Sequence, residues 1–115
     1  MSARQPCRGD IWSVSFDPTL GREQSGTRPA LVLSVDKFNH GPADLVVVLS
    51  ITSKDKRQPI HVPVTPPEGG LKLASFVKCE DIRSVSRQRF RQFHGIVSAR
   101  IVAEVEMRVR VLLNL

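Results

Sequence analysis

A succession of short apolar segments, separated at close intervals by turn residues, constrains the fold of this chain more than any other feature. Residues 11–16 alternate in the manner of a strand, so that Trp12, Val14 and Phe16 share one face, which we expect to be the inner one. Further segments of strand length occupy residues 30–35, 45–51, 60–64, 73–79 and 82–85, the last extending or following its predecessor, and turns are expected at 39–42 and 66–70. Five or six short strands with close turns predict a small barrel or curled sheet.

The pattern changes after the last of these segments. Ser86 is a candidate N-cap for a short helix over residues 87–93, which Gly95 would end. A second helix is predicted to begin after Ser98, because apolar residues then recur every three or four positions. These residues are Ile101, Val105, Val109 and Leu112. The sequence therefore predicts a mainly β fold that is closed by a C-terminal helix.

The charge balance is basic. The chain has 115 residues, which fits a single domain over 1–115, and it carries 17 Lys and Arg against 11 Asp and Glu, for a net charge of +6. Most of the cations are arginine, which suits bidentate contacts with phosphate. This balance favours a polyanionic partner, either nucleic acid or an acidic protein segment, over a merely solvated basic surface.

The cysteines and the N-terminus point to a location. Cys7 and Cys79 form no disulfide framework, and neither lies at a spacing typical of zinc ligands. The first eight residues contain no apolar leader segment, and no apolar run approaches the roughly 18 residues of a membrane span. We expect a reduced, cytoplasmic protein that has no membrane association, metal or cofactor.

The loop between the first two predicted strands carries the first candidate chemistry. Glu23 and Arg28 lie five residues apart around Gly26. RNA cleavage by the neighbouring 2′-hydroxyl needs a base, charge stabilisation at the phosphorane and an acid for the leaving oxygen. Glu23 is a candidate base, and Arg28 a candidate for stabilising the phosphoryl oxygens. The alternative is a solvated loop with an exposed ion pair.

Two other groups of polar residues follow predicted strands. Thr52 and Ser53 end the valine-rich strand, where a hydroxyl can hold a phosphate oxygen or simply cap the strand. Two cations bracket two acids in the segment 78–83, which offers either acid–base chemistry or a surface ion-pair network. No spacing brings two of the three histidines together, so His40, His61 and His94 are each expected to be structural.

Several of these segments together resemble the MazF/PemK family of messenger-RNA-cleaving toxins. The matching stretches are Arg8-Gly9-Asp10-Ile11-Trp12, Phe16-Asp17-Pro18, Gly21-x-Glu23-Gln24-x-Gly26-x-Arg28-Pro29-Ala30-Leu31-Val32-Leu33-Ser34, Ile51-Thr52-Ser53, Ile82-Arg83-Ser84-Val85 and Arg89-x4-His94-Gly95. The resemblance extends from about Arg8 to Leu115, and the long block around Glu23 and Arg28 is its most specific part.

The resemblance implies an SH3-like curled β-barrel, of the CcdB/PemK-like kind, with a C-terminal helix. It implies a homodimer that cleaves single-stranded RNA at a short preferred sequence without a metal, leaving a 2′,3′-cyclic phosphate and a 5′-hydroxyl. It also implies a cognate antitoxin whose acidic, flexible tail occupies the basic RNA groove, which agrees with the net charge of +6.

The resemblance also assigns roles to single residues. Arg28 stands at the family's catalytic arginine, Thr52 at a threonine that contacts the scissile phosphate, and Glu23 at a glutamate proposed as base in some members. Lys78 and Glu80 fall where some members use an arginine and an aspartate for acid and base roles. Residues expected to bind RNA are Arg22, Gln24, Ser53, Lys54, Lys56, Arg57 and Arg83.

Two other classes of function remain open on the sequence alone. CcdB-like toxins share the barrel but act by binding DNA gyrase, and they lack the context of Arg28-Pro29 and Thr52. A catalytically inactive RNA-binding or regulatory member is the other alternative. Only an endoribonuclease would yield cut RNA.

Overall fold

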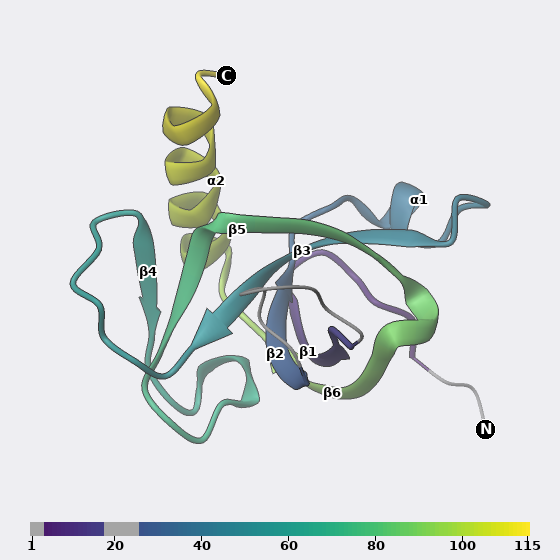
Figure 1. The fold of residues 1–115 in the computed structure, drawn as a ribbon, viewed down its shortest axis with the longest axis horizontal. Helices are drawn as coiled ribbons and strands as arrows, with labels where there is room; N and C mark the ends of the chain where they lie inside the picture. Colours follow the sequence, from purple (N-terminus) through teal and green to yellow (C-terminus); the bar gives the residue numbers. More distant parts are fainter. Residues whose placement is uncertain (1–3, 18–25) are drawn as a thin grey trace.

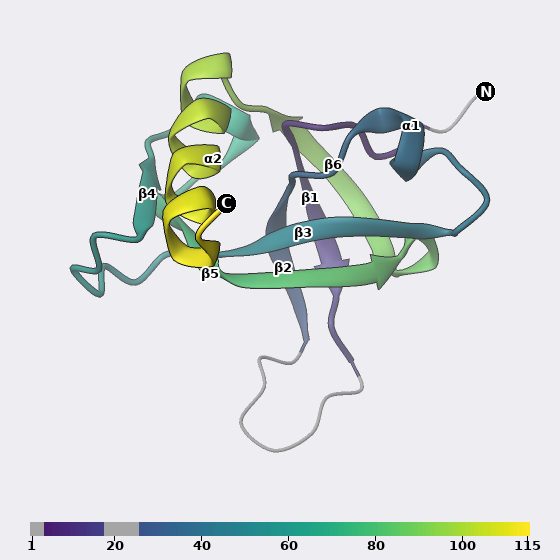
Figure 2. The same cartoon turned by 90° about the horizontal axis from the view of Figure 1, so that it is seen from above.

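Six strands form one curled, antiparallel sheet with a long helix against it (Figures 1 and 2). The computed structural model describes residues 4–17 and 26–115. The strands are β1 (Asp10–Ser15), β2 (Thr27–Val32), β3 (Leu45–Thr52), β4 (His61–Val64), β5 (Ser75–Ser86) and β6 (Phe90–Ile96), in the spatial order β4-β5-β3-β2-β1-β6. The helical segments are α1 (Asp36–Asn39), the 3₁₀ turns η1 (Glu68–Gly70) and η2 (Arg87–Arg89), and α2 (Ala99–Leu113). No helix among the described residues is long and apolar enough to cross a membrane.

The sheet curls because β5 is bent where it passes β3. Leu49 pairs with Ile82 but Ile51 pairs with Val77, so two steps along β3 are matched by five along β5. Extra residues of this kind form a bulge, which bends the strand and increases its twist. As a result, one half of β5 pairs with β4 and the other half crosses the molecule beside β3 (Figure 1).

Both faces of the sheet are buried, which the alternation in residues 11–16 did not predict. Trp12, Val14 and Phe16 pack inside the curl, as expected, together with Val46 and other residues of β2, β3 and β5. However, Ile11 on the opposite face is also fully buried, in a second cluster that α2 covers. The expectation of one inner and one outer face on β1 was therefore wrong at Ile11.

The C-terminal helix confirms the prediction from its apolar period. Ser98 is its N-cap, with Oγ accepting a hydrogen bond from the amide of Ile101 at 3.3 Å. Ile101, Val105 and Val109 are buried against the sheet. Leu112, the last residue of the predicted stripe, is partly exposed, because the helix extends beyond the edge of the sheet.

The helix predicted over residues 87–93 was wrong. Ser86 does cap a helical turn, its Oγ accepting from the amide of Gln88, but that turn ends at Arg89 and β6 follows. Pairing with β1 decides the outcome, because it lets the Phe90 and Phe93 rings pack on Trp12 at centroid distances of 5.7 and 5.6 Å. Tertiary packing overrides local helix propensity here.

The remaining differences are shifts in boundaries. The strand predicted over 30–35 lies at Thr27–Val32, and residues 73–79 and 82–85 belong to one strand, β5. The turn at 39–42 is preceded by the single helical turn α1, and that at 66–70 contains η1. The early start of β2 matters most for function, because it places Arg28 on a strand.

Candidate active site

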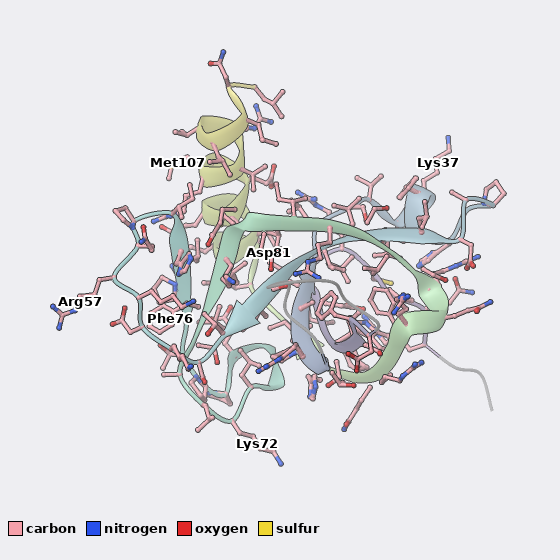
Figure 3. The ribbon with its side chains drawn as sticks, viewed as in Figure 1. Lys37, Arg57, Lys72, Phe76, Asp81 and Met107 are labelled. Atoms are coloured by element: carbon pink, nitrogen blue, oxygen red, sulfur yellow. The ribbon has the colours of Figure 1, made fainter. Side chains whose placement is uncertain are left out.

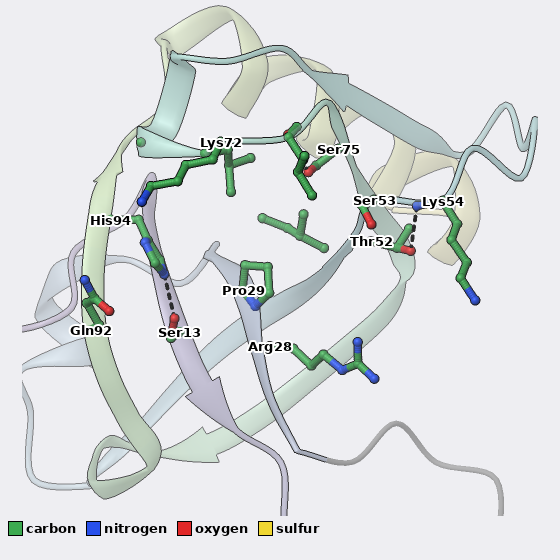
Figure 4. Close-up of a pocket in the computed structure, with 14 residues that line it drawn as sticks. Ser13, Arg28, Pro29, Thr52, Ser53, Lys54, Lys72, Ser75, Gln92 and His94 are labelled. Atoms are coloured by element: carbon green, nitrogen blue, oxygen red, sulfur yellow. Dashed lines mark hydrogen bonds between the residues drawn. The ribbon is translucent and has the colours of Figure 1, made fainter.

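A cavity of about 490 Å³ opens at one end of the curled sheet (Figure 4). Its floor contains Pro29 of β2 and Ile51 of β3, which continue the face of the sheet that carries the helix-covered core. Five separate segments contribute the rest of the wall. These lining residues are Ser13, Arg28, Thr52, Ser53, Lys54, Gly70, Leu71, Lys72, Leu73, Ser75, Gln92 and His94.

The β2–β3 pairing brings Arg28 and Thr52 to the same end of the sheet. The antiparallel β2–β3 pairing runs from Val32–Val48 to Ala30–Ser50, and Arg28 and Thr52 each lie two residues beyond that last pair. Arg28 is exposed, whereas Thr52 is half-buried. The Thr52 hydroxyl accepts a hydrogen bond from the amide of Lys54 at 3.1 Å, which orients it at the end of β3. Two residues 24 positions apart in the chain therefore face one cavity.

A hydrogen-bonded pair forms the other side of the cavity. Ser13 Oγ of β1 and His94 Nε2 of β6 are 2.5 Å apart. Figure 4 shows this pair and Gln92 on one side of Pro29, with Arg28 and Thr52 on the other. His94 was expected to be structural and to lie beside a helix end. The strand β6 instead makes it part of the cavity wall.

Two glycines allow the backbone beside His94 to pack closely. A Cβ on Gly70, whose φ is +71°, would lie 1.9 Å from the His94 carbonyl oxygen, and one on Gly95 would lie 2.7 Å from the carbonyl carbon of Gly69. The segment after η1 therefore lies directly against β6, where any larger residue would force the two apart. This contact fixes the position of the His94 backbone in the cavity wall.

The cavity is lined by cations and by no carboxylate among the residues the structure describes. Arg28, Lys54 and Lys72 come from β2, the end of β3 and the segment after η1. A concave site with one sign of charge concentrates oppositely charged ligands. Its hydroxyl, amide and imidazole groups add hydrogen-bonding capacity, so the cavity suits an anionic, hydrogen-bonding ligand such as a phosphodiester.

Comparison with known proteins gives the family. Residues 7–113 match the family model described as PemK-like, MazF-like toxin of type II toxin-antitoxin system. The chain belongs to this family. It is 33% identical over 113 residues to endoribonuclease MazF9 of Mycobacterium tuberculosis, covering 94% of this chain and 96% of that protein. It is also 37% identical over 79 residues to endoribonuclease PemK of Escherichia coli, covering 68% of this chain and 59% of that one.

Solved structures of MazF toxins share the fold. MazF from Deinococcus radiodurans superposes with a TM-score of 0.86 at 30% identity, covering 98% of this chain and all of that one. A MazE–MazF structure from the same organism gives a TM-score of 0.81 at 30% identity, covering 98% and 99% of the two chains. The predicted fold class, a curled β-barrel with a C-terminal helix, is confirmed for this PemK/MazF family member.

The acid and base candidates Lys78 and Glu80 do not line this cavity. They lie at the bulge of β5, in a network of ion pairs that joins the strand to β4. Glu80 Oε2 is 2.9 Å from Nε2 of the buried His61, and Lys78 Nζ is 3.9 Å from an Asp81 carboxylate oxygen. Asp81 also accepts a hydrogen bond from Arg83 Nε at 3.0 Å.

This bulge network lowers the pKa values of its acids. Partial burial tends to raise the pKa of the Glu80 carboxyl, but the hydrogen bond with His61 and nearby positive charge hold that pKa below its usual value. Burial likewise works to raise the pKa of Asp81, but hydrogen bonds from Arg83 and Ser50 and the nearby positive charges together outweigh it, so that this pKa is also lowered. Both carboxylates are thus held in the ionised, paired state.

The predicted RNA-binding residues are divided among several places. Ser53 and Lys54 line the cavity, whereas Lys56 and Arg57 are exposed further along the β3–β4 loop, where Arg57 points outward (Figure 3). The Arg83 guanidinium stacks over the Phe16 ring, 4.8 Å from its centroid. Arg22, Glu23 and Gln24 lie outside the described residues.

Sequence reasoning missed the cavity residues Ser13, Lys72, Gln92 and His94. Lys72 lies between the turn expected at 66–70 and the strand expected at 73–79, and His94 was expected beside a helix end. One signal was available: Gly95 follows His94 inside what proves to be a strand, and a glycine in a strand often marks a close approach of two backbones.

Proposed function

We propose that this toxin is an endoribonuclease that cleaves single-stranded RNA in the cavity at the end of β2 and β3. The observation that carries the proposal is that Arg28 of β2 and Thr52 of β3 line one cavity, together with the cations Lys54 and Lys72. The curated relatives named above are endoribonucleases, which favours RNA cleavage over the gyrase-binding alternative.

The chemistry combines Arg28 and Thr52, which line the cavity, with Glu23, the candidate base from the sequence. The RNA 2′-hydroxyl attacks the adjacent phosphorus, and negative charge develops on the phosphoryl oxygens. The Arg28 guanidinium and the Thr52 hydroxyl donate hydrogen bonds to those oxygens, and Arg28 does so without giving up a proton. The Glu23 carboxylate accepts the proton of the 2′-hydroxyl. The products are a 2′,3′-cyclic phosphate and a 5′-hydroxyl, and the reaction needs no metal or cofactor.

The surrounding basic residues hold the RNA strand. Ser53 and Lys54 contact it at the cavity, and Lys56, Arg57, Arg83, Arg22 and Gln24 extend the contact along the two flanking loops. A cognate antitoxin, of the kind that MazE is for MazF in the related complex, occupies the same basic surface with an acidic, flexible tail. Both partners are polyanions, so they compete for one site.

The active form is a homodimer of single-domain chains, working in the cytoplasm. The support for the dimer is the apolar surface that α2 leaves uncovered, which includes Met107 (Figure 3), Val111 and Leu113, each more than half exposed. Light scattering at micromolar concentration is expected to give a particle of twice the chain mass. A 12.8 kDa species alone would contradict the dimer.

The test of the function is cleavage of a long single-stranded RNA in excess EDTA, followed by mapping of the cut ends. Discrete cuts with 2′,3′-cyclic phosphate and 5′-hydroxyl ends support the proposal and give the recognised sequence. If RNAs of several sequences stay intact, and Arg28→Ala behaves like the unaltered protein, the proposed function is wrong.

A further inference from the structure

We propose that His94, held by Ser13, is the general acid that protonates the leaving 5′-oxygen during cleavage. This inference rests on the proposed endoribonuclease function and adds a catalytic group to it. The reaction needs such an acid, because expulsion of an unprotonated alkoxide is slow at neutral pH. None of the groups assigned above supplies it, since Arg28 stabilises charge, Thr52 donates a hydrogen bond and Glu23 accepts a proton.

His94 is the one described residue in the cavity wall that carries an imidazole. The other polar groups of the wall are hydroxyls, an amide, two ammonium groups and a guanidinium. Guanidinium and ammonium groups hold their protons far above neutral pH, and hydroxyls and amides do not release theirs, whereas an imidazole exchanges a proton readily there. Within the described wall, His94 is therefore the best suited group for proton transfer.

The placement of His94 also fits an acid. In-line displacement puts the attacking and leaving oxygens on opposite sides of the phosphorus. Arg28 and Thr52 lie on one side of Pro29 and the Ser13–His94 pair on the other (Figure 4), so a phosphate held by Arg28 has His94 across the cavity. Protonated His94 donates from Nε2 to Ser13 Oγ, which leaves the Nδ1–H to serve as the acid.

The structure fixes His94 both at its ring and at its backbone. Ser13 bonds one ring nitrogen at 2.5 Å. The backbone of Gly70 packs against the His94 carbonyl, and Gly69 packs against Gly95, as their missing Cβ atoms allow. A catalytic group fixed in this manner loses little entropy when the substrate binds.

The charged groups around His94 leave it without a competing carboxylate among the described residues. In the cavity it faces the cations Arg28, Lys54 and Lys72. On the elements that pack against β6, Asp10 of β1 is paired with Arg4 at 2.8 Å, and Glu68 of η1 accepts from the amide of Ser98 at 2.7 Å. Ser13 is therefore the hydrogen-bond partner that the described residues give the His94 ring.

The cleavage step conserves both bonds and protons. The 2′-oxygen forms a bond to phosphorus as its proton passes to the Glu23 carboxylate. The bond between phosphorus and the 5′-oxygen breaks, and that oxygen takes the proton from His94 Nδ1. The products are a 2′,3′-cyclic phosphate, a 5′-hydroxyl, neutral His94 and protonated Glu23. Exchange with water then restores both residues.

The first measurement is the single-turnover cleavage rate against pH for His94→Gln, with His40→Gln as the matched control. His40 lies on the other side of β1, bonded to the Pro6 carbonyl and outside the cavity. His94→Gln should cleave about 100-fold more slowly or worse, and should lose the fall in rate at higher pH that a protonated imidazole acid gives the unaltered protein. His40→Gln should keep both rate and profile.

The decisive measurement repeats the assay with an RNA whose leaving 5′-oxygen is replaced by sulfur. A thiolate leaves without protonation, since thiols titrate near pH ~8.5 and alcohols far higher. His94→Gln should then cleave within a few-fold of the unaltered protein, whereas Arg28→Ala should stay defective. Equal loss on the oxygen and sulfur substrates would overturn the acid role and make His94 a structural residue. An unchanged rate on the oxygen substrate would overturn it too.

Ser13→Ala separates positioning from catalysis. It should slow cleavage of the oxygen substrate by roughly 3- to 30-fold, about the value of one lost hydrogen bond. The fall in cleavage rate at higher pH, which is assigned to His94, should persist. If Ser13→Ala abolished this fall in rate, the serine hydroxyl, and not His94, would carry the proton to the leaving 5′-oxygen. Failure of the endoribonuclease function itself is distinct, because then the unaltered protein would cut neither substrate.

Discussion

Two polar regions of this molecule lie on neighbouring strands and differ in how their charges are compensated. Around the cavity, the described residues supply the cations Arg28, Lys54 and Lys72 and no carboxylate. At the bulge of β5, the cations Lys78 and Arg83 bracket the acids Glu80 and Asp81, and all four take part in ion pairs. The cavity region presents positive charge toward the cavity, whereas the bulge region pairs its positive and negative charges with one another.

The difference indicates which region meets RNA. Paired charges at a partly exposed bulge contribute little free energy and attract a polyanion weakly. A concave cluster of cations attracts a polyanion strongly. The bulge network also shapes the cavity indirectly, since the bend in β5 is what curls the sheet around it.

Arg28→Ala should have the largest effect on cleavage, a loss of about 10³-fold or more, because it removes the charge-assisted hydrogen bonds to the phosphoryl oxygens. Arg28 is exposed at the start of β2, so thermal unfolding should be nearly unchanged. Single-turnover cleavage and a melting curve check the two statements. A folded Arg28→Ala protein that cleaved at the unaltered rate would show that the active site has been assigned to the wrong region.

Thr52→Val should cost about 10- to 100-fold in cleavage rate, the value of one hydrogen bond to a charged group. Valine keeps the β-branched shape that suits the end of β3. The check is the rate with saturating enzyme, which reports the chemical step and not RNA affinity. Thr52→Ser offers the matched control, because it retains the hydroxyl and should recover most of the rate.

Replacing either cavity lysine, as in Lys72→Ala or Lys54→Ala, should weaken binding by a similar factor for all RNA sequences. Each should also reduce the slope of log Kd against log salt concentration by about 0.7, the value for one phosphate contact on a single strand. Lys37→Ala, on α1 and remote from the cavity (Figure 3), is the control and should leave the slope unchanged. An effect of Lys37→Ala as large as that of Lys72→Ala would mean that net charge, not the cavity, governs binding.

Glu80→Gln should have the smallest effect on cleavage and should instead alter the pH dependence of stability. The hydrogen bond with His61 lowers the pKa of Glu80 in the folded state, so its stabilising contribution is present above the ordinary value of 4.5 and is lost as pH falls below it. At pH 7 the variant should be less stable by at most about 1 kcal/mol, and the gap should close in acid. Urea unfolding at several pH values measures this. A loss of cleavage comparable to that of Arg28→Ala would instead give Glu80 the catalytic role that the family resemblance implies.

Those parts of the fold that depend on local pattern could be predicted from the sequence. The stripe containing Ile101, Val105 and Val109 specified α2, and the valine-rich run specified β3. The helix expected over 87–93 failed because the aromatic contacts between Trp12 and Phe93 that decide it join residues 81 positions apart. Ile11 was misplaced for a related reason, since only the curl buries both faces of β1.

In the candidate site too, the residues in local motifs could be predicted, and those brought together by strand pairing could not. Arg28 and Thr52 were found because they lie in contiguous motifs that resemble a family. Ser13 and His94 were not, because their contact depends on the pairing of β1 with β6, although His94 does lie in one of the stretches that resemble the family. Only the structure could show that Lys78 and Glu80 lie outside the cavity, since their distance from Arg28 depends on the bulge in β5.

The measurement that tests the central claim most directly is NMR mapping of a non-cleavable RNA, with 2′-O-methyl groups throughout, onto the uniformly ¹⁵N-labelled protein. The amides of Ser13, Thr52, Lys54, Lys72 and His94 should shift on titration, and those of His61 and Glu80 should not. Shifts concentrated at the β5 bulge, with the cavity amides unmoved, would contradict the assignment of the cavity as the RNA site.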